Sequence, residues 1–585
     1  MSLHADLIFK GLKAMMISSA PGTADTPRAH LLNPMAMECL RELGLEDDAV
    51  RMGVTGPPLE YMRWCYSMVG EEYGKIYAWG GAPSTKADVV SSTPSRFLDC
   101  PQSYLEPILL RYASTNGITC RFDTELVSFE HDGKGIVSTV KDRISQNTYQ
   151  IRSRYLFGAD GGRSVVGRSG GFEFLVEPSG GVACNVHFTA DLDRRMSDRD
   201  AQLHVIMKPD ARTRFGIAPI IRMIRPYTDW MLVAFSPGLK EDPFRHLTPT
   251  SPELLEYLKE AIGDESIEIK VKRLEPWNIR ETVADKYSKP GNVYLLGDAA
   301  HRHPPAYGLG SNTSMQDAYN LGWKVLYVSK GLAGPALLES YSTERQPVGA
   351  RLVRESNECM DRHAAVWAAL GMFAETPEDG ARQIAELSQS TEAGTVRREQ
   401  LYQALEGKRR EGESFGFNMN QWYTSSAVYL DDEEPRAEFA KDYILDIYIS
   451  TYPGNRLPHA WLTAKVPSKP VSTIDIAGKG AFCIFTGHGG DAWKEAAAEI
   501  SKSTGIPIKS YSIGWGLDYN DKYREWIKRR EVGEDGCVLV RPDRYVAWRS
   551  KKMIPDCKAK LQHVLDHVLS RDQLTHANGS ANGSV

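Results

Sequence analysis

The sequence predicts a multi-domain protein that combines α/β and α+β units. Short apolar runs of strand length lead into polar loops in the first half of the chain, and strands alternate with helices in the last part. The length of 585 residues also exceeds what one hydrophobic core usually supports. We therefore expect two or three packed units.

The composition excludes several classes of protein. The 70 basic and 75 acidic residues are spread along the chain without a basic block, so nucleic acid is not an expected partner. No apolar run approaches the roughly 20 residues of a membrane span, and the N-terminus lacks a signal-peptide pattern. The nine cysteines lack metal-site or disulfide spacing. We expect a soluble, cytoplasmic protein with reduced thiols and no membrane contact.

The chain begins with the end of a helix followed by a strand. Leu3, Leu7 and Ile8 have helical spacing, Gly11 stops the helix, and residues 12–17 form an apolar run of strand length. This pattern predicts part of a βαβ unit.

Two further strands each lead into a loop that contains an aspartate. Residues 155–157 run into GADGGRSVVGR, which holds Asp160, and residues 293–296 run into GDAAHRHPP, which holds Asp298. Ligands of open α/β sheets bind outside the carboxyl ends of the strands. We therefore expect one nucleotide site built from two distant segments, with two ordinary turns as the alternative.

Residues 171–280 form an insert between these strands. Ser251 can cap a helix within it, and Gly263 can end that helix. The expected strands and helix of the insert lie at residues 182–190, 231–235 and 252–262. We expect this sheet to supply a wall of the substrate site.

The segment PAYGLGSN has parts that suit a flavin. Gly297 and Asp298 place a carboxylate at a strand end, where it can accept from a ribose-type hydroxyl. Gly308 and Gly310 let the backbone approach a flat ring, and a helix that begins near Ser311 directs its positive end to the same place.

The last part of the chain has a thioredoxin-like order. From residue 457 onward the pattern is strand, helix, strand, helix, hairpin, helix. Cys483 has no second cysteine three residues on, so dithiol exchange is not expected. Residues 375–414 are polar and helix-prone, which predicts a connecting layer or arm instead of a core.

Several quoted segments resemble the single-component flavin aromatic hydroxylases. DGGRS at 160–164 and GDAAHRHPPAYGLGSNTSMQDAYNLGWK at 297–324 resemble their downstream signatures, and PGTADTPRAHLLNPMAMECLRELGL is similar to the segment after their second strand. NRLPHAWL, STIDIAGKG and VLVRPDRYVAWR narrow the resemblance to phenol hydroxylase and dichlorophenol monooxygenase. SNTSMQDAYNLGWK and TPRAHLLN are most similar to fungal versions, which suggests secondary metabolism. The resemblance covers nearly the whole chain.

The resemblance implies roles in cofactor binding. Asp298 would hold the ribityl chain, and Asp160 and Arg163 would serve both FAD and the nicotinamide nucleotide. Arg28 and Gln102 would contact the phosphate and ribityl region of the flavin. Gly297 would also contact the cofactor. The residues expected to line the isoalloxazine are Gly308, Leu309, Gly310, Ser311 and Asn312.

The resemblance also implies the activity. It indicates an FAD-dependent monooxygenase that uses NADPH or NADH and O2 to hydroxylate a phenolic or aromatic polyketide substrate through a flavin hydroperoxide. His30 would hydrogen-bond the substrate or the flavin, with a structural histidine as the alternative. The alternative activity is a Baeyer–Villiger or decarboxylating oxygenation on the same scaffold. A homodimer is a possible assembly.

The implied organisation is an FAD-binding domain of the aromatic hydroxylase type in two parts, interrupted by a mixed-sheet substrate domain. A helical connector, a thioredoxin-like domain and a disordered tail follow. The boundaries of these six parts are 1–170, 171–280, 281–365, 366–454, 455–572 and 573–585.

The chain departs from the family at its N-terminus. Relatives begin with a strand and a GxGxxG turn, whereas this sequence starts after that turn, and its strand ends in Ser18 and Ser19 instead of an acidic residue. We expect an incomplete N-terminus, with a non-catalytic, FAD-free interaction protein as the alternative.

Other motifs do not predict a different chemistry. His301 and His303 suit a strand edge beside two prolines better than a metal site, and no metal is expected. GHGGDAW lacks the Lys and Ser/Thr of a P-loop, and no GxSxG elbow follows a strand.

Overall fold

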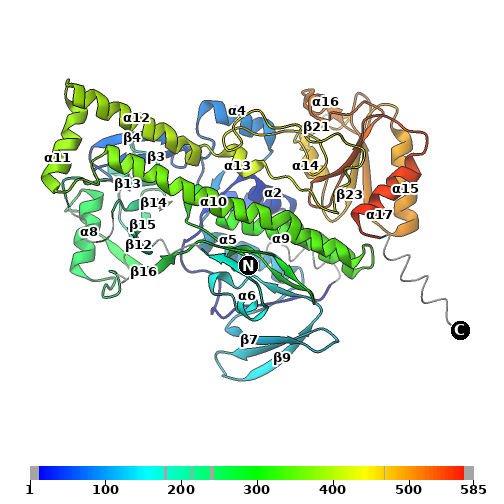
Figure 1. Cartoon of the computed structure of the whole chain (residues 1–585), viewed down its shortest axis with the longest axis horizontal. Helices are drawn as coiled ribbons and strands as arrows, with labels where there is room; N and C mark the ends of the chain where they lie inside the picture. Colours follow the sequence, from blue (N-terminus) through cyan, green and yellow to red (C-terminus); the bar gives the residue numbers. More distant parts are fainter. Residues whose placement is uncertain are drawn as a thin grey trace.

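The computed structural model describes residues 12–176, 181–211, 215, 217–237, 243–466 and 468–571 (Figure 1). The helix expected to end at Gly11 and the tail expected at 573–585 lie outside these residues. In Figure 1 the C-terminal unit forms one end of the molecule and the substrate sheet the other, with α9 and α10 crossing the middle. No helix of the described part has both the length and the apolar character needed to span a membrane.

Two parallel strand pairs form the nucleotide-binding part. β1 (Met15–Ile17) pairs with β6 (Thr119–Arg121), and β10 (Leu156–Gly158) pairs with β19 (Val293–Leu295), with Phe157 opposite Tyr294. The three strands predicted from sequence are confirmed. Because β10 and β19 run in the same direction, the loops that carry Asp160 and Asp298 leave the same edge.

Smaller elements complete this part. An antiparallel sheet of β7 to β9 lies at the bottom of Figure 1, and β2 pairs with β5. The strands are β2 (Leu31–Leu32), β5 (Leu98–Asp99), β7 (Thr124–His131), β8 (Ile136–Asp142), β9 (Thr148–Ser153), β11 (Phe174–Val176), β17 (Thr282–Ala284), β18 (Ser288–Lys289) and β20 (His301–Arg302). The helices are α2 (Pro34–Glu42), α3 (Glu46–Met52), α4 (Pro83–Ser92), α5 (Gln102–Thr115) and α6 (Val165–Ser169).

The substrate sheet has seven strands in the order β16-β12-β15-β14-β13-β3-β4. The strands predicted near 182–190 and 231–235 are present as β12 and β15. The sequence placed the whole sheet within 171–280, but β3 and β4 come from the first part of the chain and join through parallel pairing of β3 with β13. Their bounds are β3 (Tyr61–Cys65), β4 (Glu72–Tyr77), β12 (Gly181–Thr189), β13 (Leu203–Ile206), β14 (Ile220–Arg225), β15 (Asp229–Pro237) and β16 (Lys270–Ile279).

Helix α8 (Pro252–Ile262) covers one face of this sheet and has the predicted bounds. Gly263 ends it at φ 88°, a left-handed conformation that glycine adopts without a steric penalty. The predicted cap by Ser251 is wrong in detail. Ser251 stands at the N-cap position, but its hydroxyl accepts the backbone N–H of Thr248 at 2.9 Å instead of a helical N–H.

Two long helices cross the centre of the molecule: α9 (Gly310–Ser329) and α10 (Glu339–Ala369). The sequence predicted one buried face for α9, yet the helix is buried on nearly every side from Asn312 to Val328. The reason is that the C-terminal unit packs on it as well, where Phe482 contacts Trp323 and Tyr327.

Residues 375–414 form α11 (Pro377–Ala385) and α12 (Glu392–Gly412). Both segments are helical, as predicted. The sequence also predicted a connecting layer that contributes no core residues, and this is wrong for α12. Leu401 and Leu405 pack with Trp64 of the substrate sheet, and the last turn of α12 buries Lys408. α13 (Phe415–Met419) follows.

The C-terminal unit has the predicted element order. Its sheet runs β24-β23-β26-β27, with β23 parallel to β24 and antiparallel to β26. Each of the nine cysteines, including Cys483, is a free thiol. The main elements are β23 (Phe482–Thr486), α15 (Asp491–Thr504), β24 (Ile508–Ser512), α16 (Glu525–Arg529), β26 (Cys537–Val540), β27 (Val546–Ser550) and α17 (Cys557–Val568); β21 (Trp461–Thr463), β22 (Val471–Ser472), β25 (Asn520–Asp521) and α14 (Thr473–Ile476) flank them.

A buried charge network joins the C-terminal unit to α9 and α10. Glu344 of α10 accepts from Lys324 Nζ at 2.7 Å and from Arg541 Nη1 at 2.6 Å, and Arg541 also pairs with Asp543 at 2.5 Å. Burial alone would raise the pKa of Glu344, but Arg541 and Lys324 outweigh burial and hold that pKa below its usual value. The carboxylate therefore stays charged between two cations.

Because two histidines are buried, we expect the free energy of unfolding to fall in mild acid. Burial, with the charges of Arg63 and Arg456 nearby, lowers the pKa of His204 and of His459 to about 3. The unfolded chain takes up these protons below about pH 6.5, whereas the folded chain takes them up only near pH 3, so stability is lost as the pH falls through this window. Going from about pH 7.5 to 5.5 should lower the free energy of unfolding by about 1.4 kcal/mol per histidine. Urea unfolding of the protein and of His204→Asn measures this, and an identical pH dependence in both would contradict it.

Candidate active site

The two aspartate loops lie side by side at the carboxyl ends of β10 and β19. Asp160 Oδ2 accepts the backbone N–H groups of Val165 and Val166 at 2.7 and 3.1 Å and so starts α6, while its carboxylate stays exposed. Arg163 and Asp298 are also exposed. The structure therefore brings these three predicted residues to one edge of the sheet.

A buried network fixes the position of the Asp298 loop. Asp317 of α9 accepts from Gly297 N at 3.0 Å, from His301 Nε2 at 2.9 Å and from Arg345 Nε at 2.8 Å. Burial opposes ionisation of Asp317, but Arg345 and His301 outweigh it and lower its pKa. The imidazole of His301 is therefore hydrogen-bonded to the Asp317 carboxylate. His303 Nδ1 lies 2.5 Å from the carbonyl oxygen of Pro304 and 3.2 Å from Ser356 Oγ.

The glycine loop packs directly on β2. Gly308 has φ 65°, and a Cβ at this position would lie 2.8 Å from Leu31 Cδ2. Asn312 donates to the carbonyls of Leu31 and Gly308, both at 2.8 Å, and accepts from Asn33 N at 2.8 Å. The Asn312 side chain is therefore used to fix the loop, and the backbone of the loop remains as the surface that can line a ring.

The N-terminus of α9 provides an anion-binding end. Leu309 occupies the N-cap position, and no side chain caps the helix. A helix N-terminus carries partial positive charge and N–H donors, which suit a phosphate or an electron-rich ring. Together with the exposed Asp298 carboxylate and the close backbone at Gly308, this donor set fits FAD.

Gly308→Ala should weaken FAD binding. Alanine at φ 65° is strained by about 1–3 kcal/mol, and its methyl group would push on Leu31, so the loop is expected to leave its position. We expect the dissociation constant for FAD, measured by flavin fluorescence titration, to rise by about tenfold or more. Gly407→Ala is the control, because Gly407 lies in α12 and its added Cβ would meet nothing within 4 Å. Equal affinity in the two variants would contradict the role of Gly308.

His30 lies in a polar cluster beside this loop. Its Nδ1 is 2.8 Å from Asp99 Oδ2, and its side chain keeps 17% exposure whereas that of Asp99 keeps 1%. Gln202 Nε2 also hydrogen-bonds Asp99 Oδ2, and donates to Met223 O at 3.0 Å. Burial and then the charge of Arg222 lower the pKa of His30, while Asp99 opposes this shift. His30 is therefore a neutral base near pH 7.

Arg222 enters the cluster from the sheet. Its neighbours Ile221 and Met223 pack toward α8, so Arg222 points to the opposite face, where Nη2 donates to Arg28 O at 3.1 Å. Burial lowers the pKa of Arg222 to about 10 although Asp99 opposes the shift.

Three buried polar atoms of the cluster, Asp99 Oδ1, Gln202 Oε1 and Arg222 Nη1, have no hydrogen-bond partner in the described protein. Leaving such a group unpaired costs about 1–3 kcal/mol.

The segment from Arg28 to Asn33 lies between the Gly308 loop and the substrate sheet. Leu31 lies against Gly308 on one side, while on the other side His30 pairs with Asp99, to which Gln202 next to β13 also hydrogen-bonds. Gln102 N donates to Ala29 O at 2.7 Å, so Gln102 lies beside this segment, and its contact with the flavin stays a prediction. The Arg28 side chain is 56% exposed and pairs with Glu275 at 2.9 Å.

Sequence reasoning missed Asp99, Gln202 and Arg222. Asp99 lies three residues before Gln102, for which the resemblance implies a role in cofactor binding, and that position was the one available signal. Gln202 and Arg222 have no motif around them, and only the pairing of β13 with β14 brings them to this site.

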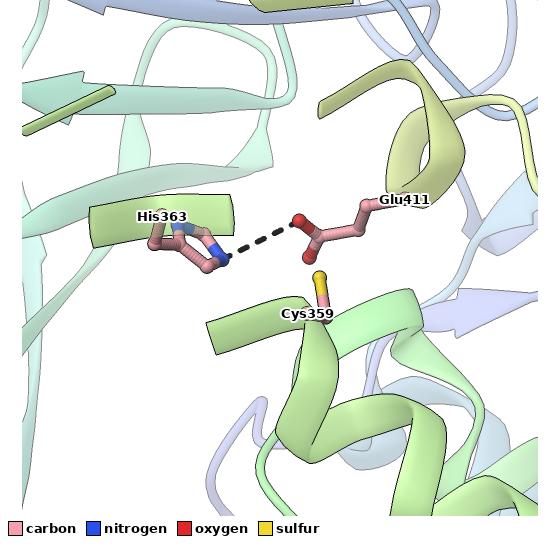
Figure 2. Close-up of side chains that lie close together, drawn as sticks. All are labelled: Cys359, His363 and Glu411. Atoms are coloured by element: carbon pink, nitrogen blue, oxygen red, sulfur yellow. Dashed lines mark ion pairs between the residues drawn. The ribbon is translucent and has the colours of Figure 1, made fainter. Parts of the chain in front are cut away.

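A second cluster has the composition of a metal site. Cys359, His363 and Glu411 lie close together in Figure 2, with His363 Nε2 3.4 Å from Glu411 Oε2. Lys408 Nζ lies among them, 2.9 Å from His363 Nε2, 3.9 Å from Cys359 Sγ and paired with Glu411. Burial also raises the pKa of the Cys359 thiol, which disfavours a thiolate ligand. The cluster fits a buried ion-pair network around an ammonium group.

Comparison with known proteins agrees with this geometry. A family model for an FAD binding domain matches residues 1–356, and one for the aromatic-ring hydroxylase C-terminal domain matches residues 450–571. Phenol 2-monooxygenase of Pseudomonas sp. (strain EST1001) is 37% identical over 95% of this chain and 89% of its own length. For 2,4-dichlorophenol 6-monooxygenase of Delftia acidovorans these values are 35%, 96% and 94%.

Solved structures extend the match. The flavin-dependent monooxygenase PieE in complex with FAD and substrate has a TM-score of 0.90 and 33% identity, covering 97% of each chain. The ternary complex of aklavinone-11 hydroxylase with FAD and aklavinone has a TM-score of 0.75 and 25% identity, covering 97% of each chain. The chain therefore belongs to the family of FAD-dependent aromatic-ring hydroxylases.

Proposed function

We propose that this protein hydroxylates a phenolic substrate, using FAD, NADPH or NADH, and O2. The observation that carries the proposal is the position of the His30–Asp99 pair between the Gly308 loop and the face of the substrate sheet that presents Arg222. The names of relatives support the substrate class, since they include phenol 2-monooxygenase and tetracenomycin A2 monooxygenase-dioxygenase of Streptomyces glaucescens. An aromatic polyketide phenol is within this class.

Bound FAD would accept the hydride and activate oxygen, and Asp298, the Gly308 loop and the N-terminus of α9 would hold it. The protein's own part is to bind the phenol against the sheet and to take its proton. The neutral imidazole of His30 accepts that proton at Nε2, because Nδ1 is turned to Asp99 Oδ2. Asp99 holds the ring in this orientation and stabilises the imidazolium that forms.

Burial around the cluster supports this role. Arg222 is nearly inaccessible to solvent, so its positive charge interacts strongly with negative charge that develops on the phenol oxygen, while the buried Asp99 stabilises the imidazolium of His30. Fungal origin and a place in secondary metabolism stay predictions. We also infer a cytoplasmic homodimer, which the reduced cysteines and the family resemblance support.

The experiment combines cofactor binding with product analysis. The purified protein is titrated with FAD, followed by its visible absorption, and then given NADPH or NADH with a panel of phenols under ¹⁸O2. We expect phenol-dependent oxidation of the nicotinamide and a product that carries one ¹⁸O on the ring. NMR of the product separates ring hydroxylation from ring expansion, and failure to bind FAD would contradict the proposal.

A further inference from the structure

A small cavity lies where the C-terminal unit meets the end of α4 and the segment that follows α13. Arg436, Arg456 and His459 are among its lining residues, and none of the described residues that line it is an aspartate or a glutamate. Arg456 is already paired with Glu38. Arg436 therefore supplies one positive charge that no carboxylate of the lining compensates.

The guanidinium group of Arg436 is held in place by aromatic rings instead of a carboxylate. It lies over Trp422 at 4.3 Å and over Tyr448 at 4.8 Å from the ring centroids. Its Nη2 donates to Asn455 Oδ1 at 2.7 Å, and no carboxylate of the described chain forms an ion pair with it. Stacking uses the faces of the guanidinium group, so N–H groups at its edge remain available to a ligand.

His459 offers a buried donor to the same cavity. Ser472 Oγ accepts the backbone N–H of Ile474 at 3.1 Å and lies 2.6 Å from His459 Nδ1. From this network we assign Nδ1 as the acceptor of the hydroxyl hydrogen of Ser472. The neutral imidazole then carries its own hydrogen on Nε2, and this atom has no hydrogen-bond partner in the described protein.

Two further side chains of the lining can donate as well. Gln421 Oε1 accepts from Arg345 Nη1 at 2.7 Å, and because a guanidinium group only donates, the NH2 group of Gln421 is the end left for a ligand. Ser92 Oγ is buried and has no hydrogen-bond partner in the part of the chain that the structure describes. The lining thus combines one uncompensated positive charge with donors from four separate side chains.

Charges around the cavity add to its positive potential. Burial, and then the charges of Arg456 and Arg529, lower the pKa of His459, while Asp475 opposes this shift. His459 therefore stays neutral near pH 7 and acts here as a donor only. A set of donors surrounded by positive charge favours an anion over a cation.

We propose that Arg436, Gln421, His459 and Ser92 form a binding site for one small monovalent anion of the size of chloride. The single uncompensated charge of Arg436 matches one negative charge, and donors from four separate side chains suit a spherical ion. Ser92 ends α4 in the first part of the chain, whereas His459 belongs to the C-terminal unit. A bound anion would hydrogen-bond both parts and stabilise the junction between them.

Anomalous diffraction locates the anion directly. Crystals of the FAD-loaded protein are soaked in sodium bromide in place of chloride, because bromide takes the same sites and scatters anomalously. We expect a bromide peak in the cavity, within hydrogen-bonding distance of Arg436 and of His459 Nε2. Bromide peaks that occur only elsewhere on the molecule would overturn the proposal.

Thermal unfolding measures the same binding in solution. Chloride replaces gluconate at constant ionic strength, because gluconate carries the same charge but is too large for the cavity. We expect the unfolding midpoint of the FAD-loaded protein to rise by about 1–3 °C and to level off with chloride concentration, as binding to one site requires. A rise that never saturates would contradict the proposal, since it reports a general effect of salt on hydration.

A pair of arginine variants assigns the response to the cavity. Arg436→Gln should abolish its saturable part. Arg154→Gln is the matched control, because Arg154 also lies over an aromatic ring, that of Tyr155 at 5.3 Å, but is outside the cavity lining. Visible absorption of bound FAD verifies that each variant folds. An equal chloride response in the two variants would overturn the proposal, and the bromide experiment decides it without a variant if Arg436→Gln fails to fold.

Discussion

Replacement of His30 by alanine is expected to lower the rate of hydroxylation by about 10²–10⁴-fold, the usual contribution of a positioned general base. The physical reason is that the phenol proton then has no acceptor inside a buried site. Single-turnover measurement of the hydroxylated product, with FAD bound and reduced beforehand, separates this step from flavin reduction.

The pH profile gives this prediction a second readout. Because burial and Arg222 lower the pKa of His30 below 6.5, the imidazole stays neutral and active into mild acid, and activity falls only once the pH drops through that lowered value. The His30→Ala variant should lose this acid limb. His187→Ala is the matched control, since His187 forms a similar pair with Asp229 at 2.9 Å on the sheet. A wild-type rate in His30→Ala would show that His30 is a structural histidine.

The second large effect is expected at Glu344. Glu344→Leu leaves Lys324 and Arg541 buried without their shared carboxylate, and breaking a buried pair in this way costs about 3–5 kcal/mol. Because these residues come from α9, α10 and the C-terminal unit, the loss should destabilise the junction between the two parts. Urea unfolding followed by circular dichroism measures the effect.

A surface pair provides the comparison for Glu344. Glu499 and Lys558 pair at 2.7 Å with both side chains well exposed, so Glu499→Leu is expected to leave the unfolding midpoint nearly unchanged. If the two variants unfold alike, the buried network does not stabilise the junction.

Local patterns were sufficient to predict much of the fold. The strands before Asp160 and Asp298, helix α8 and the element order of the C-terminal unit follow from short-range periodicity and turn residues. The motifs also predicted that the loop at Gly308 leads directly into a helix, because glycine spacing before a helix reflects backbone geometry that a short segment determines by itself.

The substrate side could not be predicted in the same way. β3 lies in the first part of the chain, outside the insert predicted at 171–280, and it joins the substrate sheet through its parallel pairing with β13. Arg222 alternates with Ile221 and Met223 as any strand residue would, and its role depends on Asp99 and His30 from another part of the chain. Likewise, Lys408 belongs to a polar helix whose last turn is buried by tertiary packing.

The pairing of β10 with β19 has a consequence for biosynthesis. β10 leaves the ribosome long before its partner, and the strands from β12 to β16 are made in between. Contacts between residues so distant in sequence form slowly, since a long loop must close first. We expect the inserted sheet to collapse before the nucleotide-binding part, which becomes resistant to protease only after Leu295 has emerged. Nascent chains that stall before this point would expose an unpaired strand edge, which makes them the species most in need of a chaperone.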